Sequence, residues 1–166
     1  LSNEACPFAT AREIDLAEAR PLAVRMSFVG ELGWELYIPT EFSVNVFDAL
    51  MEVGEEFDLK LVGLHALDSL RLEKGYKHWG ADITPDDTPF ESGLGFCVKM
   101  DKEDFIGRDA LAERLKAEPE RKLVIFTLED PEPLIYHDEP IYRDGELLSE
   151  NTHGSFSHVL NAAIGM

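Results

Sequence analysis

The stretch of sequence that decides the fold runs from Phe28 to Tyr37 and reads FVGELGWELY. It contains Gly30 and Gly33, and they lie between two β-prone arms, 24–29 and 34–38. Paired glycines between such arms are typical of a hairpin or tight bend, because glycine adopts backbone angles that other residues avoid. The pattern therefore predicts two strands joined through this bend.

An aromatic ring and two carboxylates lie close together at the bend, since Trp34 is flanked by Glu31 and Glu35. A carboxylate can accept two neighbouring N–H donors at once, so it suits the edge of a flat heterocycle. The bend is therefore a candidate site for such a ligand. A hairpin with solvated acidic residues is the alternative that the spacing leaves open.

A second informative segment, Ala66–Gly75, reads ALDSLRLEKG. Leucines at helical spacing predict a helix over 64–74, which Gly75 ends. Asp68 and Arg71 are three residues apart, so they form a pair on one side of that helix. Charged residues among leucines favour a structural ion-pair network over a catalytic set.

Four further elements complete the first part of the chain. Apolar spacing predicts a helix over 41–57, with Thr40 as its N-cap. One or two helical turns are expected within 11–19, a strand over 94–99, and a short helix over 108–116.

The pattern changes after residue 116 to short β-like runs. Asp144-Gly145 lies between two of them and indicates a hairpin. The predicted fold class is α+β, with an α+β domain over 1–116 followed by part of a small antiparallel β-barrel over 117–166. The β-like runs cover 122–128, 139–143, 146–149 and the C-terminal stretch.

Composition restricts the classes of partner. The formal charge of −18 over 166 residues would repel a phosphate backbone or an anionic bilayer, so we expect neither nucleic acid nor membrane as partner. The cysteines Cys6 and Cys97 lack CxxC spacing and favour reduced thiols over a disulfide or metal site. His153 and His158 are five residues apart, which fits no zinc motif, so no metal site is predicted.

Four blocks occur in order along the chain, GELGWELYIP, GLHALDSLRLEKGYKHWGADI, TPFESGLGF and FIGRDAL. Together they resemble the folate-binding T-protein family, which includes the aminomethyltransferase of glycine cleavage and the C-terminal parts of sarcosine and dimethylglycine dehydrogenases. The second block looks closer to the dehydrogenase branch. The resemblance implies a ferredoxin-like, T-protein-type α+β domain before the barrel.

The resemblance also implies a folate site. Glu35 aligns with the glutamate that binds the pterin in the family, and a reduced pterin presents an N3–H and a 2-amino group that one carboxylate can accept. Trp34, Arg71 and Glu31 are the other candidate folate-binding residues, although Glu31 equally suits backbone N–H groups of the bend. Leu67 departs from the arginine that is typical of the glycine cleavage enzyme.

The implied reaction is demethylation coupled to tetrahydrofolate. An N-terminal flavin domain carrying FAD, outside this chain, would oxidise an N-methyl amine to an iminium, and tetrahydrofolate bound here would become 5,10-methylenetetrahydrofolate. The catalytic acid and base are not assigned. The chain is expected to be a piece of a longer polypeptide, inactive alone, and located in the cytoplasm or the mitochondrial matrix of a eukaryote.

Two further readings of the resemblance remain open. The chain could be part of a glycine cleavage aminomethyltransferase, against which Leu67 and the KHWGAD block argue. It could also be a non-catalytic regulatory or interaction relative on the same scaffold, which a loss of folate affinity despite Glu35 would favour.

Overall fold

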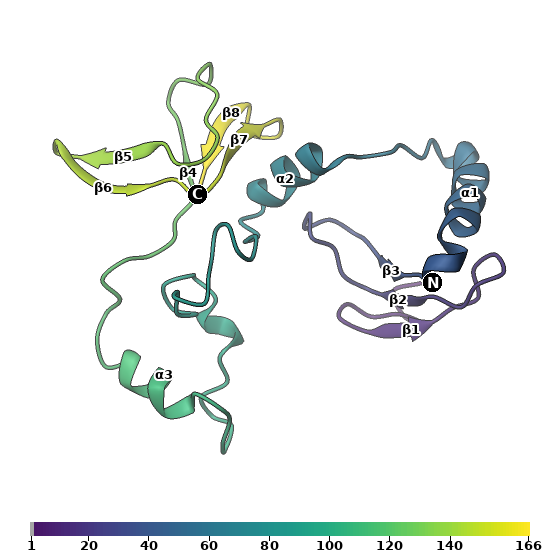
Figure 1. The fold of residues 1–166 in the computed structure, drawn as a ribbon, viewed down its shortest axis with the longest axis horizontal. Helices are drawn as coiled ribbons and strands as arrows, with labels where there is room; N and C mark the ends of the chain where they lie inside the picture. Colours follow the sequence, from purple (N-terminus) through teal and green to yellow (C-terminus); the bar gives the residue numbers. More distant parts are fainter. Residues whose placement is uncertain (1) are drawn as a thin grey trace. The chain divides into compact units, whose positions relative to one another are not determined.

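The protein, seen here in a computed structural model that describes residues 2–166, combines helices with antiparallel sheets, so the predicted α+β class is confirmed (Figure 1). The chain divides into two compact units, one ending at Lys74 and one beginning at Gly75. The predicted domain boundary at 116/117 stays a prediction. None of the helices within residues 2–166 has both the length and the apolar character needed to cross a bilayer.

The first unit is built on a three-stranded sheet of β1 (Ala11–Glu13), β2 (Leu22–Val24) and β3 (Glu35–Tyr37), in that order. β2 pairs antiparallel with β3, with Val24 opposite Glu35. The predicted strand pair around the bend is therefore confirmed, but its first arm ends at Val24 rather than Val29. The arm stops because Met26 N–H bonds locally to the Val24 carbonyl, 2.9 Å away.

The helical turns expected within 11–19 are wrong. Residues 11–13 form β1, which pairs with β2, and Leu16 and Ala19 form an isolated antiparallel bridge around a tight turn. Ala17 has a φ of 51° in this turn, and this left-handed conformation does not occur within a right-handed helix. Pairing with a strand further along the chain has overridden the local helical tendency of the alanines.

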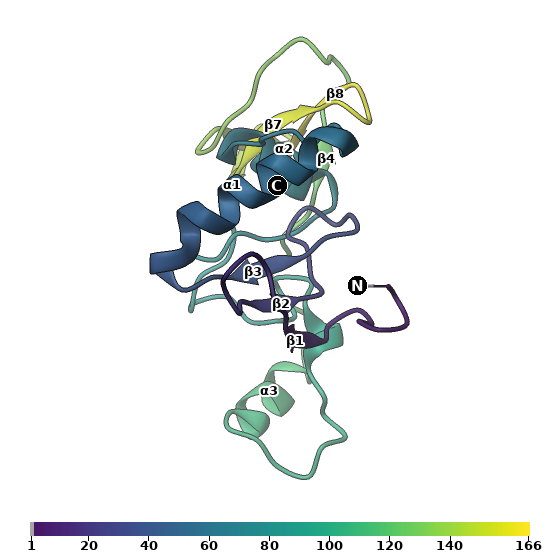
Figure 2. The same cartoon turned by 90° about the vertical axis from the view of Figure 1, so that its right-hand side faces the viewer.

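The helix expected over 41–57 is confirmed as three consecutive pieces: η1 (Thr40–Phe42), α1 (Ser43–Gly54) and η2 (Glu55–Phe57). Thr40 is not the N-cap, because Pro39 precedes the first turn and makes no side-chain cap. Thr40 instead contributes its carbonyl, to which the Ser43 hydroxyl donates at 2.8 Å. Among the three strands of the first unit's sheet, β3 is the one drawn nearest α1 in Figures 1 and 2.

The second helix of this unit, α2 (Leu64–Glu73), is confirmed within a residue of its predicted range. Lys74 N–H bonds to the Arg71 carbonyl at 3.2 Å and closes the last turn. Gly75 follows with a φ of +70°, a conformation that ends a right-handed helix.

The second unit contains two short helical elements, η3 (Gly95–Cys97) and α3 (Arg108–Arg114). α3 confirms the helix expected over 108–116. The strand expected over 94–99 is wrong, because Cys97 N–H and Val98 N–H bond to carbonyls three residues earlier. These local bonds form a 3₁₀ turn, and none of the described strands pairs with the segment.

The rest of the second unit is antiparallel β-structure. β5 and β6 form a two-stranded hairpin, and β4, β8 and β7 form a sheet in that order. Ala163, Ile164 and Met166, in or next to β8, are buried at its core. The strands are β4 (Phe126–Thr127), β5 (Pro140–Arg143), β6 (Glu146–Glu150), β7 (Gly154–Ser157) and β8 (Ala162–Gly165).

Candidate functional site

Glu35 is the first residue of β3, at the edge of the three-stranded sheet. Its side chain shares a sheet face with that of Tyr37, two residues on, because side chains alternate along a strand. The Tyr37 hydroxyl donates to Glu35 Oε2 at 3.0 Å. Glu35 is only half-buried, so its carboxylate keeps accepting capacity for a further partner.

The interaction with Glu35 also affects Tyr37. The hydrogen bond to Glu35, and secondly the negative charge of that carboxylate, raise the pKa of Tyr37 above 10.0. Tyr37 therefore remains a neutral hydroxyl, and a donor, throughout the physiological range. Its hydroxyl hydrogen-bonds to one oxygen of Glu35 and leaves the carboxylate ionised.

Trp34 precedes Glu35 directly and is covered on one face by Arg25. The Arg25 guanidinium carbon lies 4.6 Å from the centre of the Trp34 ring, which is a cation–π contact. Arg25 is 6% exposed, and its Nη2 donates to Asn3 Oδ1 at 2.5 Å. Because Arg25 is buried and hydrogen-bonded to Asn3, it restricts the orientation of the indole.

Glu31, at the other end of the bend, forms an ion pair with Lys74. Glu31 Oε1 and Lys74 Nζ are 2.9 Å apart. The Glu31 side chain is 64% exposed. The structure thus joins the bend to the C-terminal end of α2.

Arg71 is completely buried in α2, and its Nε donates to Asp68 Oδ1 at 3.2 Å. The helical ion pair expected from the spacing is confirmed, and its arginine is fully buried. Leu67, on the same helix, is half-buried. The Arg71 guanidinium is fully buried in this structure. A folate-binding role of Arg71 stays a prediction.

The structure therefore places all four predicted site residues in the first unit: Glu31, Trp34 and Glu35 on or next to the bend, and Arg71 inside α2. Three residues that support the bend were missed from the sequence, namely Arg25, Tyr37 and Lys74. Tyr37 could have been found from its strand spacing to Glu35. Arg25 and Lys74 could not, because their contacts depend on how the connection folds.

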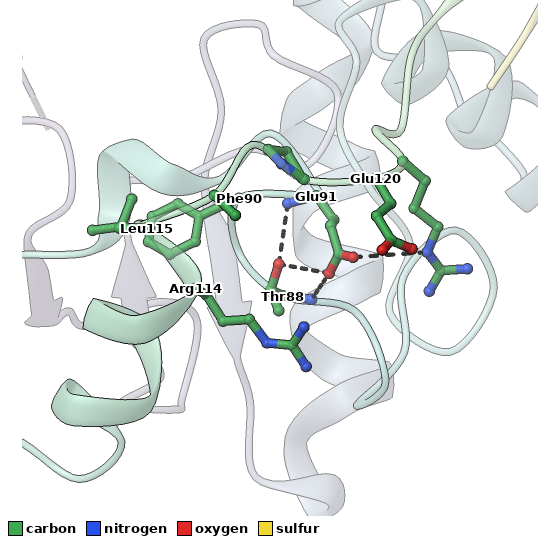
Figure 3. Close-up of a pocket in the computed structure, with 9 residues that line it drawn as sticks. Thr88, Phe90, Glu91, Arg114, Leu115 and Glu120 are labelled. Atoms are coloured by element: carbon green, nitrogen blue, oxygen red, sulfur yellow. Dashed lines mark hydrogen bonds and ion pairs between the residues drawn. The ribbon is translucent and has the colours of Figure 1, made fainter.

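A cavity of about 440 Å³ in the second unit contains none of these predicted site residues (Figure 3). Glu91 lies in its wall, and Thr88 donates to Glu91 Oε2 through its backbone N–H at 2.8 Å and its hydroxyl at 2.6 Å. These bonds, more than the nearby Arg121 and Arg114, hold the pKa of Glu91 below 4.5. The cavity is lined by Thr88, Phe90, Glu91, Arg114, Leu115, Ala117, Pro119, Glu120 and Arg121.

A second cavity of the same unit, about 520 Å³, has Asn151 and Thr152 in its wall, and both bond to other parts of this unit. The amide of buried Asn151 bonds to Tyr136 O and Glu139 N, and Thr152 donates to buried Asp82 at 2.8 Å. No cluster of three or more His, Cys, Asp or Glu suited to a metal ion occurs among residues 2–166. Cys6 is buried and Cys97 exposed, and both are free thiols.

Comparison with known proteins gives two family matches along the chain. The GCVT N-terminal domain matches residues 1–102, and the glycine cleavage T-protein C-terminal barrel domain matches residues 121–166. A solved structure, the glycine cleavage system aminomethyltransferase T of Bartonella henselae, superposes with a TM-score of 0.85 at 27% identity. That superposition covers 99% of this chain and 45% of the other.

Curated relatives fall into the same families. The 4-methylaminobutanoate oxidase (formaldehyde-forming) of Paenarthrobacter nicotinovorans is 45% identical over 99% of this chain and 20% of its own length. Human mitochondrial sarcosine dehydrogenase is 43% identical over 99% of this chain and 18% of its own. An aminomethyltransferase of Halothermothrix orenii is 43% identical over 91% of this chain and 42% of its own.

These matches confirm the resemblance seen in the four sequence blocks. The chain spans about a fifth of the length of the oxidase and dehydrogenase relatives, and less than half of the aminomethyltransferase. With a family match over residues 1–102 and a second over 121–166, the chain belongs to the glycine cleavage T-protein family.

Proposed function

We propose that this chain is the folate-binding region of a sarcosine or dimethylglycine dehydrogenase-like flavoenzyme. It would hold the tetrahydrofolate that accepts a one-carbon unit from an oxidised N-methyl amine. The observation that carries the proposal is the half-buried Glu35 carboxylate, to which the Tyr37 hydroxyl donates at 3.0 Å. The oxidase and dehydrogenase relatives, matched over nearly all of this chain, support the branch.

The residues present fit a pterin edge. Glu35 keeps free lone pairs for two parallel N–H donors, and the neutral Tyr37 hydroxyl fixes the carboxylate plane. Trp34 precedes Glu35 in the chain, and its aromatic ring, covered on one side by Arg25, is a second candidate surface for the ligand. When bound, tetrahydrofolate supplies the amines that take up the one-carbon unit.

The contribution of the chain itself is positioning. Holding the folate in one orientation converts a bimolecular encounter with the arriving one-carbon unit into an effectively unimolecular step. In this proposal an N-terminal flavin domain of the parent polypeptide carries FAD and performs the oxidation. The compartment, cytoplasm or mitochondrial matrix, belongs to the proposal as well.

Binding of tetrahydrofolate to the complete polypeptide that contains this chain, measured by calorimetry, tests the site. Glu35→Gln removes a charge-assisted acceptor, so we expect a loss of about 1–3 kcal/mol in binding free energy. Glu41→Gln is the matched control, because Glu41 is exposed on η1 and lies outside the bend. An affinity unchanged by Glu35→Gln would remove that residue from the site.

A second candidate function is demethylation that releases formaldehyde, which the name of the 45% identical oxidase relative favours. The two functions differ in their product. With an N-methyl amine substrate, the folate proposal predicts methylenetetrahydrofolate in place of formaldehyde once tetrahydrofolate is added. Equal formaldehyde yield with and without tetrahydrofolate would favour the second candidate.

Ligand binding by the complete polypeptide separates the remaining two functions from the proposed one. An aminomethyltransferase of glycine cleavage would take its one-carbon unit from an aminomethyl-lipoyl carrier protein, and its complete polypeptide would bind no FAD. A non-catalytic relative would bind no tetrahydrofolate although Glu35 is intact.

A further inference from the structure

Lys74, the last residue of the first unit, packs directly on the bend. A Cβ built on Gly30 would lie 2.5 Å from Lys74 Cγ, 3.0 Å from its Cβ and 3.1 Å from its Cδ. The aliphatic stem of Lys74 thus occupies the space that a side chain at position 30 would need. The Lys74 ammonium continues past the glycine and pairs with Glu31 at 2.9 Å.

This contact is suited to fixing geometry more than to adding stability. The side chains of Lys74 and Glu31 are 40% and 64% exposed, so water and salt screen their attraction. The stem over Gly30 is in van der Waals contact with the backbone, where a displacement of a few tenths of an ångström is already resisted. Together they set where the bend lies relative to the end of α2.

A second contact fixes the same stretch from its other end. Arg25, buried at 6% exposure, stacks 4.6 Å from the Trp34 ring centre. Lys74 and Arg25 therefore bracket residues 30–34, which lead directly into Glu35. The backbone of Glu35 itself is held in the sheet, opposite Val24.

We propose that Lys74 is a positioning residue for the folate site. Its stem over Gly30 and its ion pair with Glu31 dock α2 onto the bend and hold Trp34 and Glu35 in the arrangement that receives the pterin. Glu31 accordingly acts through Lys74 rather than by contacting the ligand. This inference rests on the proposed function.

The test measures tetrahydrofolate affinity and the midpoint of thermal unfolding, on the complete polypeptide. Lys74→Ala removes both the stem and the charge, and we expect affinity to fall about tenfold, a change of roughly 1.4 kcal/mol. Lys74→Met keeps most of the stem, so its loss is expected to be about threefold, in line with a screened ion pair. Lys74→Arg is expected to retain nearly full affinity. The unfolding midpoint should move little in all three.

A charge exchange separates positioning from direct contact with the ligand. Glu31→Lys alone places two cations together and should weaken binding, whereas Glu31→Lys combined with Lys74→Glu re-forms the pair and should restore most of the affinity. Lys60→Ala is the control, because Lys60 forms an exposed ion pair with Asp58 in the same unit. Its affinity should match the wild type.

Each contrary outcome overturns a defined claim. If Lys74→Ala binds folate normally while Glu35→Gln does not, the positioning role is wrong and the proposed function stands. If neither Lys74→Arg nor the exchanged pair restores binding, Lys74 contacts the ligand itself and does not act through Glu31. If the wild-type polypeptide binds no tetrahydrofolate, the proposed function fails first.

Discussion

The chain turns twice around glycines between antiparallel strands, and the two turns are held by different contacts. Asp144-Gly145 joins β5 to β6 directly, with φ of 55° and 86° at the two residues. Two positive φ values are what a two-residue hairpin turn requires. The connection from β2 to β3 instead runs through residues 25–34. It has a positive φ at Gly30 and depends on Arg25 and Lys74 for its position.

The difference shows how a local and a long-range turn relate to function. The β5–β6 turn follows from the positive φ values of its own two residues, and a Cβ on Gly145 would meet no atom within 4 Å. The β2–β3 bend is wide enough to present Trp34 and Glu35, but its shape depends on Lys74, more than forty residues after Gly30. A binding site built in this way should be sensitive to substitutions distant in sequence, and the hairpin should not.

The largest effect on stability is expected in α2, the helix that precedes Lys74. Arg71→Met keeps most of the side-chain volume but breaks the buried pair with Asp68. We expect a loss of about 3 kcal/mol in the free energy of unfolding, at the low end for buried pairs because Asp68 is 27% exposed.

Arg143→Met on the hairpin is the matched control, because Arg143 is exposed and should cost no more than about 0.5 kcal/mol. Denaturant unfolding of the complete polypeptide measures both variants. Equal losses would remove the distinction between the two regions.

A smaller and more direct contrast comes from adding one methyl group to each turn. Gly145→Ala meets no atom within 4 Å, so it should cost only the left-handed backbone strain, about 1 kcal/mol. Gly30→Ala carries similar strain at a φ of +69° and also collides with Lys74, so about 2–3 kcal/mol is expected.

Gly93→Ala separates strain from collision, because Gly93 has the same φ of +69° and no atom within 4 Å. It should behave like Gly145→Ala in denaturant unfolding. In a Lys74→Ala background the excess penalty of Gly30→Ala should shrink. An excess that persisted would mean that Lys74 does not fill the space over Gly30.

The smallest effect concerns a third loop, in which Thr88 donates to Glu91. The pKa of Glu91 is lowered below its ordinary value of 4.5, so the carboxylate stabilises the fold above that pH, and the gain is lost as pH falls through the lowered pKa. Glu91→Gln should therefore be less stable than the wild type at pH 7, and the gap in unfolding midpoint should close as the pH falls below the lowered pKa of Glu91. A gap independent of pH would show that the charge is not involved.

The sequence predicted what depends on near neighbours. The Asp144-Gly145 hairpin, the end of α2 at Gly75 and the Asp68–Arg71 pair all follow from residues within a few positions of each other. The predictions for residues 11–19 and 94–99 were wrong. Residues 11–13 pair with β2 as a strand, and local hydrogen bonds fold the second segment into a 3₁₀ turn. Lys74 and Arg25 escaped notice since nothing in their spacing shows that they meet the bend.

The most direct test of the folate site is titration of tetrahydrofolate into the complete polypeptide as wild type, Glu35→Gln and Gly145→Ala. We predict that the wild type and Gly145→Ala bind with equal affinity, and that Glu35→Gln binds about tenfold more weakly, within the cost of removing a charged acceptor. Absence of binding by the wild type, or equal affinities for all three proteins, would contradict the assignment of the β2–β3 bend as the folate site.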